Sequence, residues 1–267
     1  MKTFYSHIQK RQGILASLFL MGRHLLAALT AKANHDHIKI DFFYNGSTVS
    51  VRGISDPGAD LIIKITSLDG HQMLKQKGKV GGVLWMNVKT LNFENSPTFY
   101  AVHSTRNIEE ILNSEDAEKN VIGYPALQKH ISIGPVSGEE EKARWFDEFI
   151  KFKENSHLYS VSTGKITVTE KEGQGTYYIL TEWPYQAPPG KYMVDVYAIK
   201  DKKIVESAKA DVDVEQVGIV KSLAGMAKNN GCLYGLFSII VAIGAGFGVS
   251  IISCISVRFS SDSPCAS

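Results

Sequence analysis

Residues 231–257 form one apolar stretch near the end of the 267-residue chain, and none of their side chains is charged. A helix rises about 1.5 Å per residue, so about 20 apolar residues cross a hydrocarbon core about 30 Å thick. A helix in the core of a soluble domain is rarely apolar on every side over such a length. The stretch therefore predicts one transmembrane helix, followed by a short cytoplasmic tail of residues 258–267.

Two glycines in this stretch, Gly244 and Gly248, are four positions apart. Small residues at this spacing let two membrane helices approach closely, which favours a homodimer through this face. The same spacing also arises by chance in a span that is rich in glycine. The sequence leaves both interpretations open.

The N-terminus carries a second membrane signal. Basic residues lie within 2–11, an apolar region extends over 14–29, and Ala31-Lys32-Ala33 has the pattern of a signal-peptidase site. Residues 1–33 are therefore predicted to be a signal peptide. Because Arg23 and His24 interrupt the apolar region, an uncleaved N-terminal anchor is the alternative.

Export of the N-terminus would place residues 34–230 outside the cytoplasm. The three cysteines, Cys232, Cys254 and Cys265, all lie in the apolar stretch or the tail, so the external part has no disulfide framework. Such an external domain is more usual in the bacterial periplasm than on an animal cell surface. We therefore expect a single-pass protein of the bacterial inner membrane, with its main domain in the periplasm.

The external part is patterned mainly as β-strands. Apolar and polar residues alternate in several short runs, and turn sequences such as Asn45-Gly46 and Asp56-Pro57-Gly58 separate them. Short strands at this spacing predict a mainly β fold, an antiparallel Ig-like β-sandwich over residues 34–214. The alternation is clearest at Leu61, Ile63 and Ile65, at Tyr192, Val194 and Val196, and at Ala208, Ala210, Val212 and Val214.

A helical insertion is predicted at about residues 106–156, where the alternation stops. Asn107 with Glu110, and Ser137 with Glu140, have the spacing of capping boxes at helix starts. After the second box, an apolar stripe at helical spacing predicts a helix packed on a sheet, and a partner-binding groove is the alternative. The stripe contains Trp145, Phe149 and Phe152, joined by Phe146 and Ile150. A further amphipathic helix at residues 215–230 is predicted to lead into the membrane span.

Three blocks of the sequence resemble one family. They are "FYNGSTVSVRG", "KVGGVLWMNVKTLNFENSPTFYAVHSTRNIEEIL" and "LYGLFSIIVA", spread over most of the chain. Together and in this order they resemble the uncharacterised bacterial transmembrane family Alph_Pro_TM. The resemblance implies the layout already described and no catalytic residues. It also implies an accessory role beside sulfite-exporter-type permeases, because family members are sometimes encoded next to them.

Four residues within these blocks are candidates for a partner-binding surface: Arg52, Trp85, Asn87 and Tyr100. Aromatic, amide and guanidinium groups are frequent at protein interfaces. In the alternative interpretation, Trp85 and Tyr100 are core residues of paired strands.

A metal site is a more speculative prediction. His35 and His37 flank a carboxylate close to the predicted cleavage site and together are candidates for weak Cu(II) or Zn(II) binding. The alternative is a solvated leader before the first strand. No motif for a nucleophile, a phosphate loop or a dinucleotide is present, so we expect no enzyme activity and no cofactor.

The predicted function is that of a membrane-anchored periplasmic accessory or adaptor protein, whose partner is an integral membrane protein such as a transporter. The chain has 29 Lys and Arg against 27 Asp and Glu, and no basic face stands out, which argues against nucleic acid as a partner. The alternative function is a ligand- or metal-binding module tethered to the inner membrane.

Overall fold

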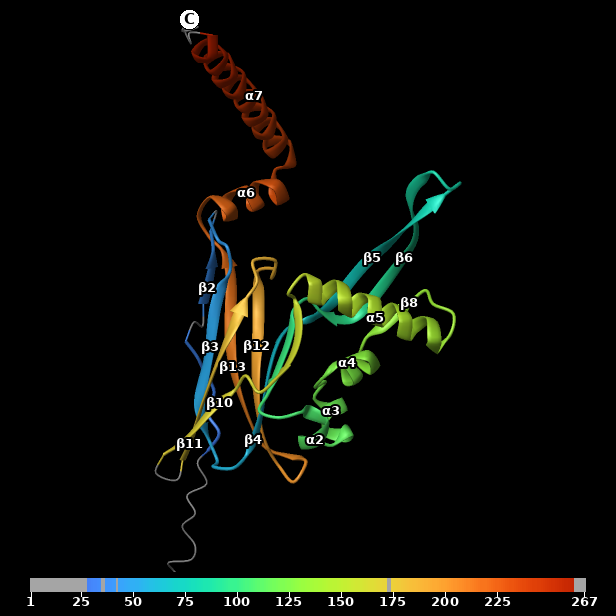
Figure 1. The fold of residues 1–267 in the computed structure, drawn as a ribbon, viewed down its shortest axis with the longest axis vertical. Coiled ribbons are helices and arrows are strands. Elements are labelled where there is room, and N and C mark those ends of the chain that lie inside the picture. Colours follow the sequence, from blue (N-terminus) through green and yellow to red (C-terminus); the bar gives the residue numbers. More distant parts are fainter. Residues whose placement is uncertain (1–27, 35–36, 42, 172–173, 262–267) are drawn as a thin grey trace, which may run out of the picture. The chain divides into compact units, whose positions relative to one another are not determined.

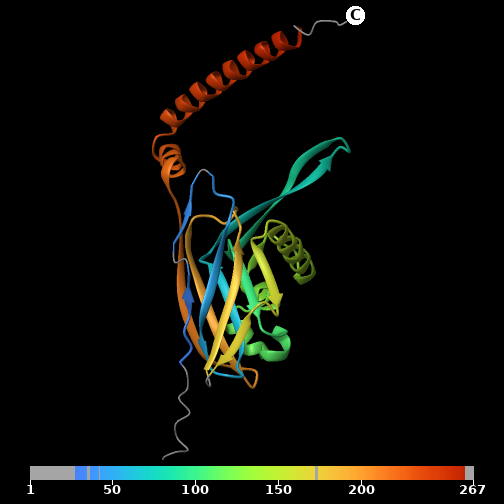
Figure 2. The ribbon, with the colours of Figure 1, turned by 60° about the vertical axis from the view of Figure 1, so that its left-hand side comes forward.

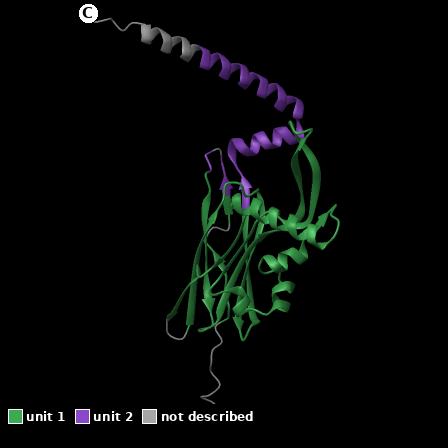
Figure 3. Cartoon of the chain, turned by 45° about the vertical axis from the view of Figure 1, so that its right-hand side comes forward, with its two compact units in different colours: residues 1–38, 45–213 green, residues 39–44, 214–267 purple. Residues whose placement is uncertain are grey.

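The structure is a computed structural model that describes residues 28–34, 37–41, 43–171 and 174–261, with side chains up to residue 250. Figure 1 shows the order of its helices and strands. The chain divides into two compact units, one of residues 1–38 and 45–213 and the other of residues 39–44 and 214–267, as Figure 3 shows. Most of the ordered elements in the first unit are strands, so the prediction of a mainly β fold is confirmed.

One sheet has four strands in the order β1 (Lys32–Ala33), β3 (Ser47–Ser55), β11 (Gln174–Trp183) and β10 (Thr167–Lys171). Side chains alternate strictly between buried and exposed along β11. This alternation places one face of the strand on the core and the other toward solvent.

A second sheet has six strands. Its central strand, residues 60–67, is covered on both faces. Residues 61–64 of this strand are therefore each less than a tenth exposed. The order is β2 (His37–Ile40), β13 (Lys203–Gln216), β12 (Gly190–Lys200), β4 (Asp60–Ser67), β7 (Tyr100–Ser104) and β9 (Tyr159–Thr163).

The two sheets pack face to face through aromatic contacts. Trp183 of β11 stacks on Phe99, with ring centres 4.9 Å apart, and meets the edge of Tyr192 of β12 at 4.7 Å. Helices cover the other face of the six-stranded sheet, as Figures 1 and 2 show. The first unit therefore has three layers: four-stranded sheet, six-stranded sheet and helices.

The Ig-like antiparallel sandwich is not confirmed in detail. The last two strands of the six-stranded sheet, β7 and β9, run parallel, so the expectation of a purely antiparallel arrangement is wrong there. A parallel pair needs a long crossover connection, whereas an antiparallel pair needs only a short turn. The helical segment between β7 and β9 is that crossover.

Four helices lie in this crossover: α2 (Ile108–Ile111), α3 (Ser114–Lys119), α4 (Tyr124–His130) and α5 (Glu139–Asn155). Asn107 caps α2, since its side-chain oxygen accepts a hydrogen bond from the backbone N–H of Glu109, so the predicted helix start is confirmed. The predicted capping box of Ser137 with Glu140 is wrong, because Gly138 is the N-cap and has no side chain to accept a hydrogen bond. The backbone N–H of Ser137 donates to Glu141 Oε2 at 2.6 Å, and α5 begins after Gly138.

The apolar stripe of α5 packs on the sheet, as predicted for all but one of its members. Phe146, Phe149 and Ile150 are buried, whereas Phe152 is 51% exposed, so its assignment to the core was wrong. Its neighbour Lys153 is buried instead. A helix turns about 100° per residue, so residue 153 lies closer than residue 152 to the line through 146, 149 and 150.

The second unit contains α6 (Gly218–Asn229) and α7 (Gly231–Ser261). Residues Gly231–Ser250 of α7 have a mean hydropathy of 2.1, and none of them is buried. Among the described residues, α7 is the one helix long and apolar enough to cross a membrane. The helix before it corresponds to the amphipathic helix predicted at 215–230.

Candidate functional site: a projecting hairpin arm

A long hairpin, here called the arm, is formed by β5 (Asp69–Val80) and β6 (Leu84–Pro97), and it projects beyond the sheets in Figures 1 and 2. It pairs with the short strand β8 (Ser132–Gly134) only near its root, at residues 92–94. The tip turns through Gly81 and Gly82, whose φ angles of 63° and 76° are ones that glycine adopts without strain.

The two faces of the outer arm differ in chemistry. Lys79 pairs with Trp85 and Lys77 with Asn87, and directly opposed residues of an antiparallel pair lie on one face. The Lys79 Nζ lies 5.4 Å from the centre of the Trp85 ring, within range of a cation–π interaction. This basic face contains both Trp85 and Asn87, which the sequence singled out.

The opposite face of the outer arm is apolar and uncovered. Val80 pairs with Leu84, and Met86 follows two positions later on the same face. Leu84, Met86 and Val88 are 65%, 53% and 51% exposed. A run of large apolar side chains left in water on a soluble domain typically marks an interaction site.

Beyond its root, which includes Asp69 and Glu94, the arm carries charge of a single sign. Between Gly70 and Phe93 the sequence contains no Asp or Glu, and the four charged side chains are all lysines. One of these, Lys89, pairs with Glu141 of α5 at 2.6 Å. The others lie at Lys75, Lys77 and Lys79.

The root of the arm is held by aromatic packing against α5. Phe93 of β6 and Phe149 of α5 stack with ring centres 4.3 Å apart, and Leu91 is buried beside them. Glu141 accepts hydrogen bonds from Lys89, from the backbone N–H of Ser137 and from the Trp145 indole, which together lower the pKa of its carboxyl to about 2. The ionised carboxylate therefore ties β6 to the start of α5.

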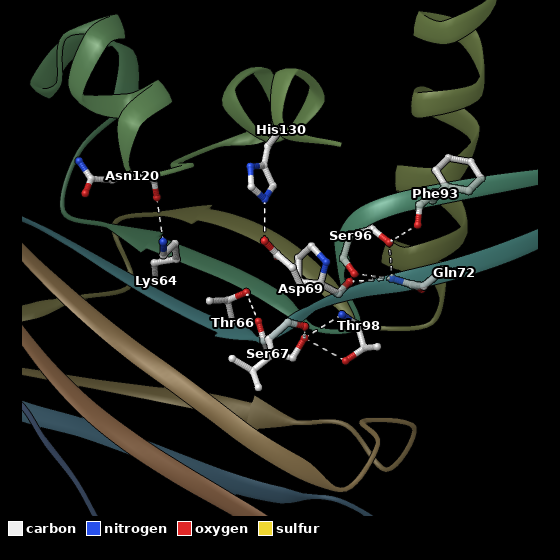
Figure 4. Close-up of polar contacts among 12 residues, drawn as sticks. Lys64, Thr66, Ser67, Asp69, Gln72, Phe93, Ser96, Thr98, Asn120 and His130 are labelled. Carbon is white, nitrogen blue, oxygen red and sulfur yellow. Dashed lines mark hydrogen bonds and ion pairs between the residues drawn. The ribbon is translucent and has the colours of Figure 1, made fainter. Parts of the chain in front are cut away.

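A polar network at the root, drawn in Figure 4, fixes both strands. The Gln72 amide nitrogen donates to Ser96 Oγ at 2.9 Å and to the Pro97 carbonyl at 2.9 Å, and Lys153 Nζ donates to the Gln72 amide oxygen. Burial lowers the pKa of Lys153 to about 8. His130 Nε2 lies 2.7 Å from Asp69 Oδ2, which joins the end of α4 to the first residue of β5.

A second part of this network lies where β4 passes into β5. Ser67 Oγ accepts hydrogen bonds from the backbone N–H and the hydroxyl of Thr98, at 2.8 and 2.9 Å. The backbone at both ends of the hairpin is thereby held by buried side chains. The root of the arm is therefore held in one conformation, which reduces the conformational entropy lost on binding.

The structure brings together two of the four predicted partner-binding residues. Trp85 and Asn87 share the basic face of the arm, whereas Arg52 lies exposed on β3 in the four-stranded sheet. Tyr100 is buried at 1% exposure, and its hydroxyl donates to the Val121 carbonyl and accepts from the Gly123 N–H. Tyr100 is therefore a core residue, as the alternative interpretation predicted.

Sequence reasoning missed the apolar face of the arm. Leu84, Met86 and Val88 alternate with Trp85 and Asn87. The same alternation is typical of a strand with one face buried in a core. The available signal was the stretch between Gly70 and Phe93, in which every charged side chain is a lysine, an unusual pattern beside so many apolar residues.

The speculative metal site gains no support. His35 lies outside the described residues, and His37 is exposed at the start of β2. Within the described ranges no group of three His, Cys, Asp or Glu side chains is placed to hold a metal ion. A Cβ at Gly244 or Gly248 would meet no described atom within 4 Å apart from the backbone of the same helix. Nothing in this single chain tests the homodimer, which stays a prediction.

The family of this chain is shown by its match to a known protein family. The family described as putative transmembrane protein (Alph_Pro_TM) matches residues 28–253, most of the chain. This chain belongs to that family. The match to Alph_Pro_TM confirms the resemblance seen in the sequence, and the apolar helix α7 agrees with the family's transmembrane description. No curated protein matches the chain.

Proposed function

We propose that this Alph_Pro_TM protein is a membrane-anchored adaptor of the bacterial inner membrane, whose periplasmic domain docks on an integral membrane protein through the arm. The observation that carries the proposal is the arm itself. It has a root fixed by buried contacts and an outer part with exposed apolar and basic faces. A domain that only had to be stable would not gain from such an element.

The composition of the arm suits an interface. Trp and Met are enriched in protein interfaces, and a central aromatic anchor commonly contributes most of the binding energy. The lysines of the outer arm, Lys75, Lys77 and Lys79, favour a partner surface that is acidic, because opposite charges steer association and exclude other partners. The expected docking surface is therefore an apolar strip bordered by Asp or Glu on a loop of a membrane protein. A sulfite-exporter-type permease, implied by the family resemblance, is one partner of this class.

The test is site-specific photo-cross-linking in intact membranes. A photoreactive residue at Leu84 or Met86 should yield one protein adduct, because these side chains would lie in the interface. The matched control is Val205 on β13, which is similarly exposed and lies outside the arm. Val205 should yield no such adduct.

Charge reversal tests the basic face. The double change Lys77→Glu and Lys79→Glu should remove the adduct formed from Leu84, without loss of the folded domain. Equal adducts from Leu84 and Val205, or cross-links from the arm to lipid alone, would contradict docking on a protein.

A tethered ligand-binding module is the alternative function. It is supported by a cavity of about 900 Å³ lined by residues of β9 and of the end of β11. The adaptor function is preferred because ligand binding in this cavity would leave the arm without a role.

A further inference from the structure

The cavity of about 900 Å³ lies between β9 and the end of β11. None of its lining residues belongs to the arm. His157 and Ser160 line one side, and Thr181 and Trp183 line the other, with Lys165 also at the wall. All these residues belong to the first unit. The proposed adaptor function does not use this cavity.

Two strand edges without a strand partner border the cavity. In the described chain, β9 is the last strand of the six-stranded sheet and pairs only with β7. Along β11, β10 pairs only with Gln174–Tyr178, so residues 179–183 have a strand neighbour on the β3 side alone. Natural sheets usually protect a free edge with charged residues or proline. Tyr159–Thr163 has neither.

The direction of the free main-chain groups of β9 follows from its bonds to β7. The Tyr100 N–H donates to the Leu158 carbonyl at 3.0 Å, and the Gly164 N–H donates to the Ser104 carbonyl at 2.8 Å. Every second residue of a parallel strand bonds to the same neighbour. The even-numbered residues therefore face β7, and Tyr159, Val161 and Thr163 direct their N–H and C=O groups to the open edge.

The cavity wall between the two edges is polar, and hydrogen bonds hold its side chains in place. His103, only 3% exposed, has Nδ1 2.5 Å from Ser162 Oγ and Nε2 3.2 Å from Thr181 Oγ1. This histidine bridges the two sheets below the opening. At the same cavity, the buried indole N–H of Trp183 has no hydrogen-bond partner among the described residues, which is uncommon for a buried donor.

We propose that this cavity binds a short extended peptide segment of a partner protein, which adds a strand between β9 and β11. Tyr159 is buried, but the outward N–H and C=O groups of Val161 and Thr163 have no strand partner in the described chain, and an extended peptide offers the matching groups at the same spacing. At about 3.3 Å per residue, the five residues of β9 match about five residues of peptide. A compact small molecule has no such row of donors and acceptors.

The test uses the full-length chain in detergent and a phage-displayed library of random ten-residue peptides. Selected peptides should protect the amides of Val161 and Thr163, which should exchange quickly in the protein alone. Thr163→Pro removes one outward N–H and leaves the bonds to β7, since proline is tolerated on such an edge. It should weaken peptide binding about tenfold, as expected for one lost hydrogen bond. Thr163→Val, which keeps the N–H, should bind as the unchanged protein does.

Three outcomes would overturn the proposal. The first is that no peptide is selected, and the second is that selected peptides bind the proline variant as well as the valine variant. The third is that the outward amides are already protected in the protein alone. Cross-linking through the arm is unaffected by any of these results, so the adaptor function stands or falls separately.

Discussion

Phe149 and Phe152 lie three residues apart on α5 and differ in burial, 1% against 51% exposed. Phe149 stacks on Phe93 and meets the edge of Tyr159 at 5.6 Å. Phe149→Ala should therefore lower the free energy of unfolding by about 3–5 kcal/mol, as removal of a buried ring does. Phe152→Ala is the matched control and should change it by less than about 0.5 kcal/mol. Urea unfolding measures both, and equal effects would show that the packing of α5 is misassigned.

His103 makes the stability of the domain depend on pH. Burial, with a smaller contribution from the charge of Lys165, lowers the pKa of His103 to about 4, against about 6.5 in an unfolded chain. Between these values the unfolded chain binds more protons, so the free energy of unfolding rises with pH. It should fall by about 3 kcal/mol from pH 7 to pH 4.

The variant His103→Gln isolates this effect, because glutamine does not titrate in this range while the other histidines remain. Urea unfolding of both proteins at pH 4 and pH 7 measures the difference. If the pH dependence is the same in both, His103 is not buried in its neutral form.

At the scale of elements, β1 conflicts with the predicted cleavage site. Lys32 and Ala33 pair with β3, Leu29 is buried, and the Thr30 N–H donates to the Ile54 carbonyl at 3.0 Å. The Tyr177 hydroxyl donates to the Thr30 carbonyl as well. Cleavage after Ala33 would remove all of these contacts, so we expect the mature chain to retain residues 28–33.

Two shortened chains test this expectation. Loss of Leu29 burial and of several hydrogen bonds should cost about 4 kcal/mol. A chain that starts at residue 34 should therefore melt about 8–16 °C below one that starts at residue 28. Near-ultraviolet circular dichroism in detergent follows the transition. Identical melting curves would mean that β1 contributes nothing, and N-terminal sequencing of the membrane-bound protein identifies the natural start.

At the scale of the whole molecule, the prediction concerns orientation in the membrane. A reporter fused after Asn230 should be periplasmic, and one fused after Phe259 should be cytoplasmic, because α7 would separate them. Alkaline phosphatase is active only after export and therefore distinguishes the two sides. Activity from the second fusion without activity from the first would reverse the topology.

The sequence by itself determined the elements with strong local signals. The apolar run became α7, Asn107 begins α2, and the alternating runs such as the one around Val194 became strands. These features depend on residues close in sequence: hydrophobic period, capping chemistry and turn residues. The family resemblance was also available from the sequence, through motifs spread along the chain.

Only the tertiary structure decided what covers each face. Trp85 and Tyr100 belong to similar alternating strands, yet Trp85 is 65% exposed on the arm and Tyr100 lies under the helices. Alternation determines which side chains share a face, and burial depends on whether a distant element packs there. The same reason explains the parallel pairing of β9 with β7 and the open edge that it leaves beside β11, since both result from where the helical crossover returns the chain.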